Sequence, residues 1–253
     1  MNPVFISILV ISIHVHIGFL LSLIKKRNDI ADIFWGIGFI LISISLYIFG
    51  YRNLNFLIIS IMVFIWGLRL SIHVYSRNKN KKEDYRYVEM KEKWGKNFYI
   101  NSYIQVFLIQ GILSLIIASP IYLSALISPS FRSITILGII LWITGFIFES
   151  VGDYQLNQFL KNPENKGKIM QTGLWKFTRH PNYFGEISQW WGLFLVCISA
   201  PLGFFSIISP LTITYLLLYV SGIPLLEKRY EGNADYEEYK KKTSVLIPLF
   251  PKK

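Results

Sequence analysis

Long apolar runs, separated by short polar and basic segments, dominate the pattern of this 253-residue chain. Roughly 17 to 25 apolar residues allow an α-helix to cross the hydrocarbon core of a bilayer. Runs of that length recur seven times, so the pattern predicts an all-α fold, a polytopic bundle of about seven transmembrane helices. The predicted spans are residues 3–24, 31–51, 54–76, 101–127, 133–152, 183–200 and 203–223.

Basic residues alternate between the two sides of these predicted spans. The connections after the first, third and fifth spans carry 3, 8 and 5 Lys and Arg residues, and the C-terminal tail carries 7. The other connections carry 1, 1 and 0. Because basic residues concentrate on the cytoplasmic side of membrane proteins, the C-terminus is predicted to be cytoplasmic and the N-terminus outside.

The composition agrees with a membrane protein, because 53% of the residues are hydrophobic and the net charge is +11. The positive charge falls between apolar runs instead of forming one patch. This distribution argues against a nucleic-acid partner and favours membrane lipids and phosphorylated cofactors. The one cysteine, Cys197, excludes an internal disulfide. No low-complexity linker interrupts the chain, so residues 1–253 are predicted to form a single membrane domain.

The C-terminal tail has a mixed pattern of its own. After Glu227, three tyrosines alternate with Lys and Glu and are followed by the apolar residues VLIPLF. This pattern predicts a cytoplasmic amphipathic helix that returns to the membrane surface.

Residues 173–191, GLWKFTRHPNYFGEISQWW, place charged and amide side chains at the mouth of a predicted span. Charge is costly in such a position and indicates a functional site. Pro181 suits the first turn of a helix, so Arg179 and His180 should stand just outside a helix N-terminus. The free N–H groups of a helix N-terminus favour a phosphate or a carboxylate.

Within that helix, Asn182, Glu186 and Gln189 share one face, because their offsets of four and seven residues bring them round at about 100° per residue. Lipid cannot satisfy these groups, so another helix, water or a ligand must. Gly185 lies between them and would let a backbone or a flat ring approach closely.

Two further clusters of charged residues lie in or beside the spans. Arg69, His73 and Arg77 share roughly one helix face and form a candidate anion site, the alternative being that the outer two reach the headgroups. Glu149 and Asp153 are four residues apart and repel each other unless one is protonated or both meet cations or sugar hydroxyls. A purely structural salt bridge is the alternative there.

Asp29 and Asp32 open the second predicted span. Either they cap the helix, or Asp32 orients a substrate oxygen or donates a proton. No group of His, Cys and carboxylate residues has zinc-like spacing, so no metal site is predicted. No glycine-rich nucleotide loop occurs either, so a dinucleotide would have to be held by membrane helices.

The chain resembles the DUF1295 family, which is related to the C-terminal domain of steroid 5-alpha-reductases. The resemblance extends from about Asp32 to Pro251. It is carried by ADIFWG, WGLRLSIHVYSRN, EDYRY, FESVGDYQLNQF, GLWKFTRHPNYFGEISQWWG, SGIPLLEKRY and DYEEYKKKTSVLIPLFP.

The resemblance implies a membrane-embedded NADPH site, formed by the C-terminal helices within residues 101–251 and by cytosolic loops. Asp153 matches the Asp that holds the cofactor in the reductases. Arg69 and Arg77 fall where their third-helix arginines approach the cofactor. The Asn-Tyr-Phe-Gly-Glu motif of the reductases matches Asn182, Tyr183, Phe184, Gly185 and Glu186.

Two departures concern the substrate half. Trp66 stands where the steroid enzymes place a tyrosine, and an indole has no hydroxyl to polarise a carbonyl. Their Gln and Glu pair in the second helix has no counterpart unless Asp29 and Asp32 take its place. These departures favour a lipophilic substrate other than a steroid.

The sequence therefore predicts an NADPH-dependent reductase of an activated carbon–carbon double bond in a sterol-, isoprenoid- or fatty-acyl-like molecule. Arg69, Arg77 and Arg179 are expected to meet the phosphates of the cofactor, and His180 is a further candidate for binding the cofactor. Asp153, Asn182 and Glu186 are expected to orient its ribose, amide or nicotinamide groups. The candidate catalytic residues are Asp32, Tyr183 and Glu186, with Asp32 or Tyr183 as proton donor.

Two alternatives remain open. Isoprenylcysteine carboxyl methyltransferases are similar in fold and carry an Arg-His-Pro-x-Tyr segment, matched here by residues 179–183, and they use S-adenosylmethionine. The chain would then be a membrane methyltransferase. The second alternative is a non-enzymatic lipid-binding membrane protein, which Trp66 makes plausible.

Overall fold

The computed structural model describes residues 1–79, 81–126, 133–199 and 202–252. Within these ranges the chain is helical and has no β-strand, apart from one isolated bridge between Thr178 and Ser244. Six helical segments of the described chain are long and apolar enough to cross a membrane, which confirms an all-α integral membrane protein. These segments are Pro3–Lys25, Ile30–Ile48, Leu54–Asn78, Tyr85–Ile117, Ser133–Lys161 and Gly203–Lys228.

The predicted number of about seven spans is close to this finding. The helix that corresponds to the predicted span 183–200 is α9, Pro181–Cys197, with 17 residues. It is shorter than the six and is not counted among them. Residues 127 and 200, at which two predicted spans end, lie outside the described residues.

The chain divides into two compact units, which are described separately. The first unit is Met1–Arg132 together with Cys197–Ser209, and the second is Ser133–Val196 together with Pro210–Lys253. The single domain 1–253 and the cofactor-binding half 101–251 stay predictions.

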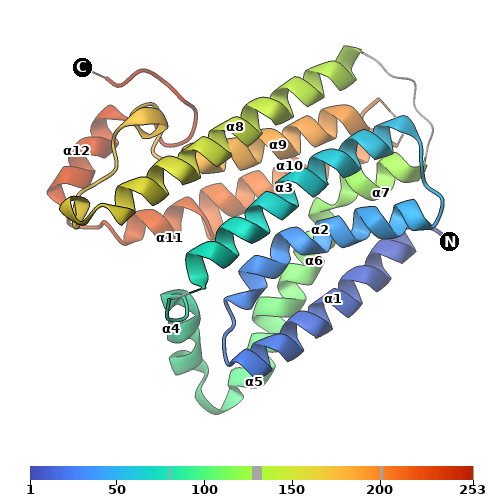
Figure 1. Cartoon of the computed structure of the whole chain (residues 1–253), viewed down its shortest axis with the longest axis horizontal. Helices are drawn as coiled ribbons and strands as arrows, with labels where there is room; N and C mark the ends of the chain where they lie inside the picture. Colours follow the sequence, from blue (N-terminus) through green and yellow to red (C-terminus); the bar gives the residue numbers. More distant parts are fainter. Residues whose placement is uncertain (80, 127–132, 200–201, 253) are drawn as a thin grey trace. The chain divides into compact units, whose positions relative to one another are not determined.

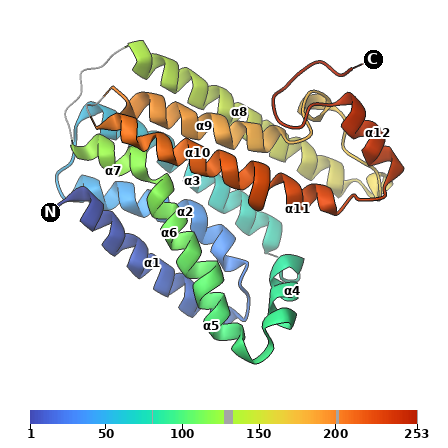
Figure 2. The same ribbon diagram turned by 180° about the vertical axis from the view of Figure 1, so that it is seen from behind.

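In the first unit, α1 (Pro3–Lys25), α2 (Ile30–Ile48) and α3 (Leu54–Asn78) lie side by side (Figures 1 and 2). Helices α2 and α3 cross where two glycines meet, since a methyl group on Gly36 would come within 2.6 Å of the Gly67 carbonyl oxygen. Beside this crossing, Trp66 is almost fully buried and its ring packs edge-on against Phe39 at 5.6 Å. Trp66 is thus part of the helix-packing core.

The rest of the first unit begins with α4 (Tyr85–Trp94), which lies within the basic segment 77–96. A helical stretch continues from it through η1 (Gly95–Asn97), α5 (Phe98–Ser102), the π-helical η2 (Tyr103–Leu108) and α6 (Ile109–Ile117). The predicted span 101–127 is interrupted at Ala118, after which α7 (Ser119–Leu126) begins. The η5 turn (Gly203–Ile207) also belongs to this unit.

The second unit is built on α8 (Ser133–Lys161) and α9, which run side by side in both views (Figures 1 and 2). The turns η3 (Pro163–Asn165) and η4 (Gly173–Lys176) connect them. After α9 come α10 (Ile208–Tyr215), η6 (Leu216–Val220), α11 (Ile223–Lys228) and α12 (Ala234–Lys242). Helix α8 continues well beyond residue 152, where the predicted span ended.

Glycines at seven-residue intervals bring α8 and α9 together. A methyl group on Gly138 would come within 2.7 Å of the Gly192 carbonyl oxygen, and one on Gly145 within 2.5 Å of that of Gly185. One on Gly152 would come within 3.2 Å of Pro181. The contacts run in opposite directions along the two helices, so the helices are antiparallel and the last turns of α8 lie beside the first turn of α9. Small residues at such spacing allow close backbone approach in membrane helices.

Candidate functional site

The corner between α8 and α9 pairs Asp153 with Asn182. Asn182 lies in the first turn of α9 and donates a hydrogen bond from Nδ2 to Oδ1 of Asp153 at 3.2 Å. Oδ1 of Asn182 is buried and has no hydrogen-bond partner among the described residues. The two residues that the sequence predicted for ribose, amide or nicotinamide groups therefore lie together.

One turn further into the bundle, Glu149 is 3% exposed and accepts a hydrogen bond from Nε2 of Gln189 at 2.5 Å. Gln189 also donates to the carbonyl oxygen of Gly185 in its own helix at 3.3 Å. Glu149 and Asp153, the two carboxylates of α8 that were expected to repel each other, thus each accept a hydrogen bond from an amide of α9. The predicted one-face arrangement of Asn182 and Gln189 agrees with these contacts.

The remaining residues of the Asn-Tyr-Phe-Gly-Glu motif lie on the first turns of α9. The Tyr183 ring stacks on the imidazole of His180 at 5.5 Å with an interplanar angle of 14°. Phe184 packs edge-on against Phe148 of α8 at 5.0 Å. Glu186 is half-buried one turn after Asn182. The roles of Tyr183 and Glu186 stay predictions.

Glu227 of α11 joins the two residues that precede α9. Its Oε1 accepts one hydrogen bond from Nε of Arg179 at 2.9 Å and another from Nε2 of His180 at 3.1 Å. Both basic side chains are buried, with 9% and 4% exposure, and that of Glu227 is 17% exposed. We call Arg179, His180 and Glu227 the Glu227 cluster.

Arg179 also holds the end of α12. Its Nη1 donates to the carbonyl oxygens of Thr243 at 2.7 Å and Lys240 at 3.3 Å, and its backbone N–H donates to the Ser244 carbonyl at 2.9 Å. Carbonyl groups at a helix C-terminus lack partners within the helix, and a cation satisfies them well. Nε and Nη1 of this guanidinium are therefore engaged inside the protein. The role of Arg179 at a phosphate stays a prediction.

The connection between α8 and α9 forms hydrogen bonds with α8 and with α12. Trp175 donates from Nε1 to the Gly152 carbonyl oxygen at 3.1 Å and accepts a hydrogen bond at its own carbonyl from the Tyr239 hydroxyl. Gln155 accepts from the Leu174 backbone N–H at 2.9 Å. Tyr239 of α12 is consequently buried. The tyrosines expected at a membrane surface are thus partly used inside the protein.

Burial lowers the pKa of His180, and this effect outweighs the hydrogen bond to Glu227, which raises the pKa. The positive charge of Arg179 acts in the same direction as burial. His180 is therefore a neutral imidazole near pH 7. Because an ionised carboxylate only accepts hydrogen bonds, Nε2 of His180 carries the proton. Its other nitrogen, Nδ1, is buried and has no partner among the described residues.

The predicted residues of the first unit lie on α2 and α3. Arg69 is half-buried in α3, whereas Arg77 is exposed in its last turn and donates from Nε to Oδ1 of Asn78 at 3.2 Å. Their approach to a cofactor stays a prediction.

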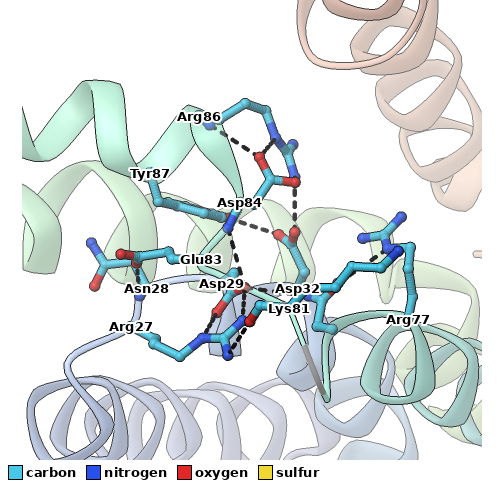
Figure 3. A network of polar contacts seen from close by, with 11 residues as sticks. Arg27, Asn28, Asp29, Asp32, Arg77, Lys81, Glu83, Asp84, Arg86 and Tyr87 are labelled. Carbon is cyan, nitrogen blue, oxygen red and sulfur yellow. Dashed lines mark hydrogen bonds and ion pairs between the residues drawn. The ribbon is translucent and has the colours of Figure 1, made fainter. Parts of the chain in front are cut away.

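Asp32 belongs to a polar network at the start of α2, shown in Figure 3. Its Oδ1 accepts a hydrogen bond from the Tyr87 hydroxyl at 2.7 Å, and its Oδ2 forms an ion pair with Arg86 at 2.9 Å. Arg86 also pairs with Asp84 at 3.0 Å. Here Tyr87, and not Asp32, carries the proton of the shared hydrogen bond. Proton donation by Asp32 stays a prediction.

The alternative that Asp29 caps α2 is met in its position but not in its side-chain contacts. Asp29 occupies the N-cap position without a side-chain cap bond and instead binds Arg27, whose Nε and Nη2 donate at 3.0 and 2.6 Å. The backbone N–H of Asp84 donates to the same carboxylate at 3.4 Å. The physical reason is that a guanidinium two residues away offers a charge-assisted bidentate contact, which is stronger than a bond to a neutral N–H.

The sequence pattern did not single out three residues that the structure places in these networks, namely Arg86, Tyr87 and Glu227. All three lie in the segments EDYRY and SGIPLLEKRY, which contributed to the family resemblance. Their partners are 47 to 55 residues away in the chain. No periodicity within one helix could have indicated them.

The comparisons with known proteins agree with the resemblance. A family described as "Protein of unknown function (DUF1295)" matches residues 18–243. The chain is 27% identical over 114 residues to 3-oxo-5-alpha-steroid 4-dehydrogenase 1 of Rattus norvegicus, a match that covers 44% of this chain and 40% of the relative. It is 28% identical over 115 residues to the Homo sapiens protein of the same name, covering 45% and 41%. The matched part is about two-fifths of the length of these relatives.

Proposed function

The chain belongs to the DUF1295 family, and from this premise we propose that it is a membrane-embedded reductase that uses NADPH on an activated carbon–carbon double bond of a lipophilic substrate. Its curated relatives are named as steroid dehydrogenases, which are redox enzymes of a lipophilic molecule. The membrane helices of this chain are consistent with a substrate that is delivered through lipid.

The observation that carries the proposal is the pair formed by Asp153 and Asn182. Because the Asn182 amide donates to a carboxylate, its Oδ1 is left as a buried acceptor, without a partner among the described residues. A buried polar atom without a partner costs about 1–3 kcal/mol, which a bound ligand can recover. The ribose hydroxyls and the carboxamide of NADPH supply suitable donors, so the residues present fit this cofactor.

The residue roles in the proposal combine the family resemblance with these contacts. Within the second unit, Asp153, Asn182 and Glu186 would hold the ribose, amide or nicotinamide groups. NADPH would supply a hydride when bound. For the matching proton, the Tyr183 hydroxyl is the better candidate, because Asp32 already accepts hydrogen bonds from Arg86 and Tyr87.

The experiment is calorimetric titration of the detergent-purified protein with NADPH and, separately, with S-adenosylmethionine. The wild-type protein should bind NADPH, and Asp153→Ala should abolish binding. Asn157→Ala is the matched control, because Asn157 lies one turn further along α8 and is exposed. The control should bind like the wild type.

The other outcomes identify the alternatives. Binding of S-adenosylmethionine without NADPH would favour a membrane methyltransferase and overturn the proposal. Binding of neither cofactor would favour a lipid-binding protein without enzymatic activity. Full retention of NADPH binding in Asp153→Ala would refute the site.

A further inference from the structure

The Glu227 cluster leaves a second acceptor beside the one on Asn182. Glu227 receives the Nε2 proton of His180, so the neutral imidazole presents a bare lone pair at Nδ1. The whole His180 residue is only 3% exposed. Its Nδ1 atom has no hydrogen-bond partner within the described chain. In an imidazole the two nitrogens point in widely different directions, so Nδ1 is directed away from Glu227.

The same arrangement occurs twice at the start of α9. Glu227 orients His180, and Asp153 orients Asn182, so each carboxylate takes the donor of its partner. Each partner then retains one buried acceptor, and only Pro181 separates the two residues in the chain. Two buried acceptors require hydrogen-bond donors. The oxygens of an ionised phosphate are hydrogen-bond acceptors, so a phosphate is a poor partner for two acceptors.

We infer that His180 Nδ1 is a ligand-binding acceptor that, together with Asn182 Oδ1, receives neutral hydrogen-bond donors of the nicotinamide half of the cofactor, with Glu227 as the positioning residue. This inference rests on the proposed function. The donor chemistry is either the carboxamide NH₂ or the neighbouring hydroxyls of the nicotinamide ribose. It assigns His180 to a donor-bearing group and not to a phosphate.

Three features hold the imidazole for this role. The hydrogen bond from Nε2 to Glu227 sets the tautomer of the imidazole, and stacking on Tyr183 sets the plane of the ring. The guanidinium of Arg179, whose Nε lies 2.9 Å from Oε1 of Glu227, keeps that carboxylate ionised. Burial keeps the imidazole neutral, because it lowers the pKa of His180. An acceptor that is fixed before binding loses little entropy when the ligand arrives.

Two substitutions separate the acceptor from the rest of the side chain. In asparagine the terminal oxygen is attached to Cγ, as Nδ1 is in histidine, so His180→Asn retains an acceptor near the Nδ1 position. In glutamine the terminal amide lies one bond further out, near the Nε2 position, so His180→Gln retains a donor to Glu227 and loses the acceptor. The proposal predicts about tenfold weaker NADPH binding in His180→Gln, the loss of one hydrogen bond of about 1.4 kcal/mol. His180→Asn should lose less, because it keeps the acceptor although it lacks the bond to Glu227.

Three ligands locate the donor. They are NADPH, its 3-acetylpyridine analogue, which lacks the amide NH₂, and adenosine 2′,5′-bisphosphate, which lacks the nicotinamide half. If the donor is the amide, His180→Gln weakens NADPH but not the acetyl analogue. If the donor is the ribose, it weakens both dinucleotides equally. In either case the binding of adenosine 2′,5′-bisphosphate should not change.

Two results would overturn the inference while leaving the proposed function intact. One is wild-type NADPH affinity in His180→Gln. The other is an equal loss for all three ligands, which would mean that the substitution only disturbs the fold. Failure of the wild-type protein to bind NADPH would instead refute the proposed function.

The positioning role of Glu227 has a separate readout in the folded protein. Nitrogen-15 chemical shifts distinguish an imidazole protonated at Nε2 from one protonated at Nδ1. The wild-type His180 should show the Nε2–H form, and Glu227→Gln should change it toward a mixture of tautomers. An unchanged Nε2–H signal in Glu227→Gln would show that Glu227 does not position the ring.

Discussion

Gly185 of α9 lies against Gly145 of α8 so closely that a methyl group on Gly145 would come within 2.5 Å of the Gly185 carbonyl oxygen. This contact sets the distance between the two helices. It lies two turns of α8 before Asp153 and one turn of α9 after Asn182. The geometry of the proposed cofactor site therefore depends on a glycine contact between the two helices.

Replacing Gly185 by Val should consequently disturb the site as well as the fold. The added side chain meets backbone atoms of α8, which cannot move aside, and overpacking of this kind costs about 1–3 kcal/mol. We expect a lower melting temperature and weaker NADPH binding. Thr144→Val is the control, because Thr144 is exposed on α8 and the change is nearly isosteric. An unchanged melting temperature in Gly185→Val would contradict the packing described here.

Arg179 should be needed for the order of the C-terminal segment. Its replacement by Ala removes the bonds to Glu227 and to the last carbonyl groups of α12, leaving a half-buried carboxylate without its ion pair. Loss of one partner of a buried pair costs about 3–5 kcal/mol. Limited proteolysis should then cut after residues 240–242 much faster than in the wild type. The exposed Lys176→Ala is the control, and equal cleavage rates in both variants would contradict the role of Arg179.

The depressed pKa of His180 predicts a pH dependence of stability. Between the folded pKa and the unfolded value near 6.5, the unfolded chain binds more protons than the folded protein. The free energy of unfolding should therefore rise with pH in this window, and the stabilisation is lost as the pH falls through the folded pKa. Glu227 opposes this effect and Arg179 supports it. Melting temperatures of wild type and His180→Asn between pH 5 and 7.5 provide the test. The variant should show a smaller slope, and identical slopes would contradict a buried neutral His180.

In the first unit, Arg27 should stabilise the start of α2. Asp29 has a side-chain exposure of only 3%, and Arg27 supplies two of its hydrogen bonds. Arg27→Ala leaves this carboxylate partly unsatisfied, at a cost of about 1–3 kcal/mol. The melting temperature of Arg27→Ala should therefore be lower than that of the exposed control Lys25→Ala. Equal melting temperatures would show that the network of Figure 3 contributes little to stability.

The membrane helices could be predicted from the sequence because the length of an apolar run is a local property of the chain. The interruption at Ala118 could not, since the apolar run continues across it. The seven-residue spacing of Gly138, Gly145 and Gly152 indicates a face of α8 that packs closely against another helix. The sequence does not indicate that this other helix is α9.

The candidate site was predictable to a similar degree. Asn182 and Asp153 stood out because polar groups beside an apolar span need a partner, and each proved to have the other. Glu227 did not stand out, because an acidic residue in a charged tail is unremarkable until its distant partners Arg179 and His180 are seen. Pairing across about 50 residues is a tertiary property, which no local pattern encodes.

The most direct test of the central claim is titration of NADPH into the purified wild-type protein and into Asn182→Ala. This substitution removes both the donor to Asp153 and the buried acceptor Oδ1. The account predicts saturable binding to the wild type and no measurable binding to Asn182→Ala, while the exposed control Asn157→Ala binds normally. Equal NADPH affinity in all three proteins would contradict it.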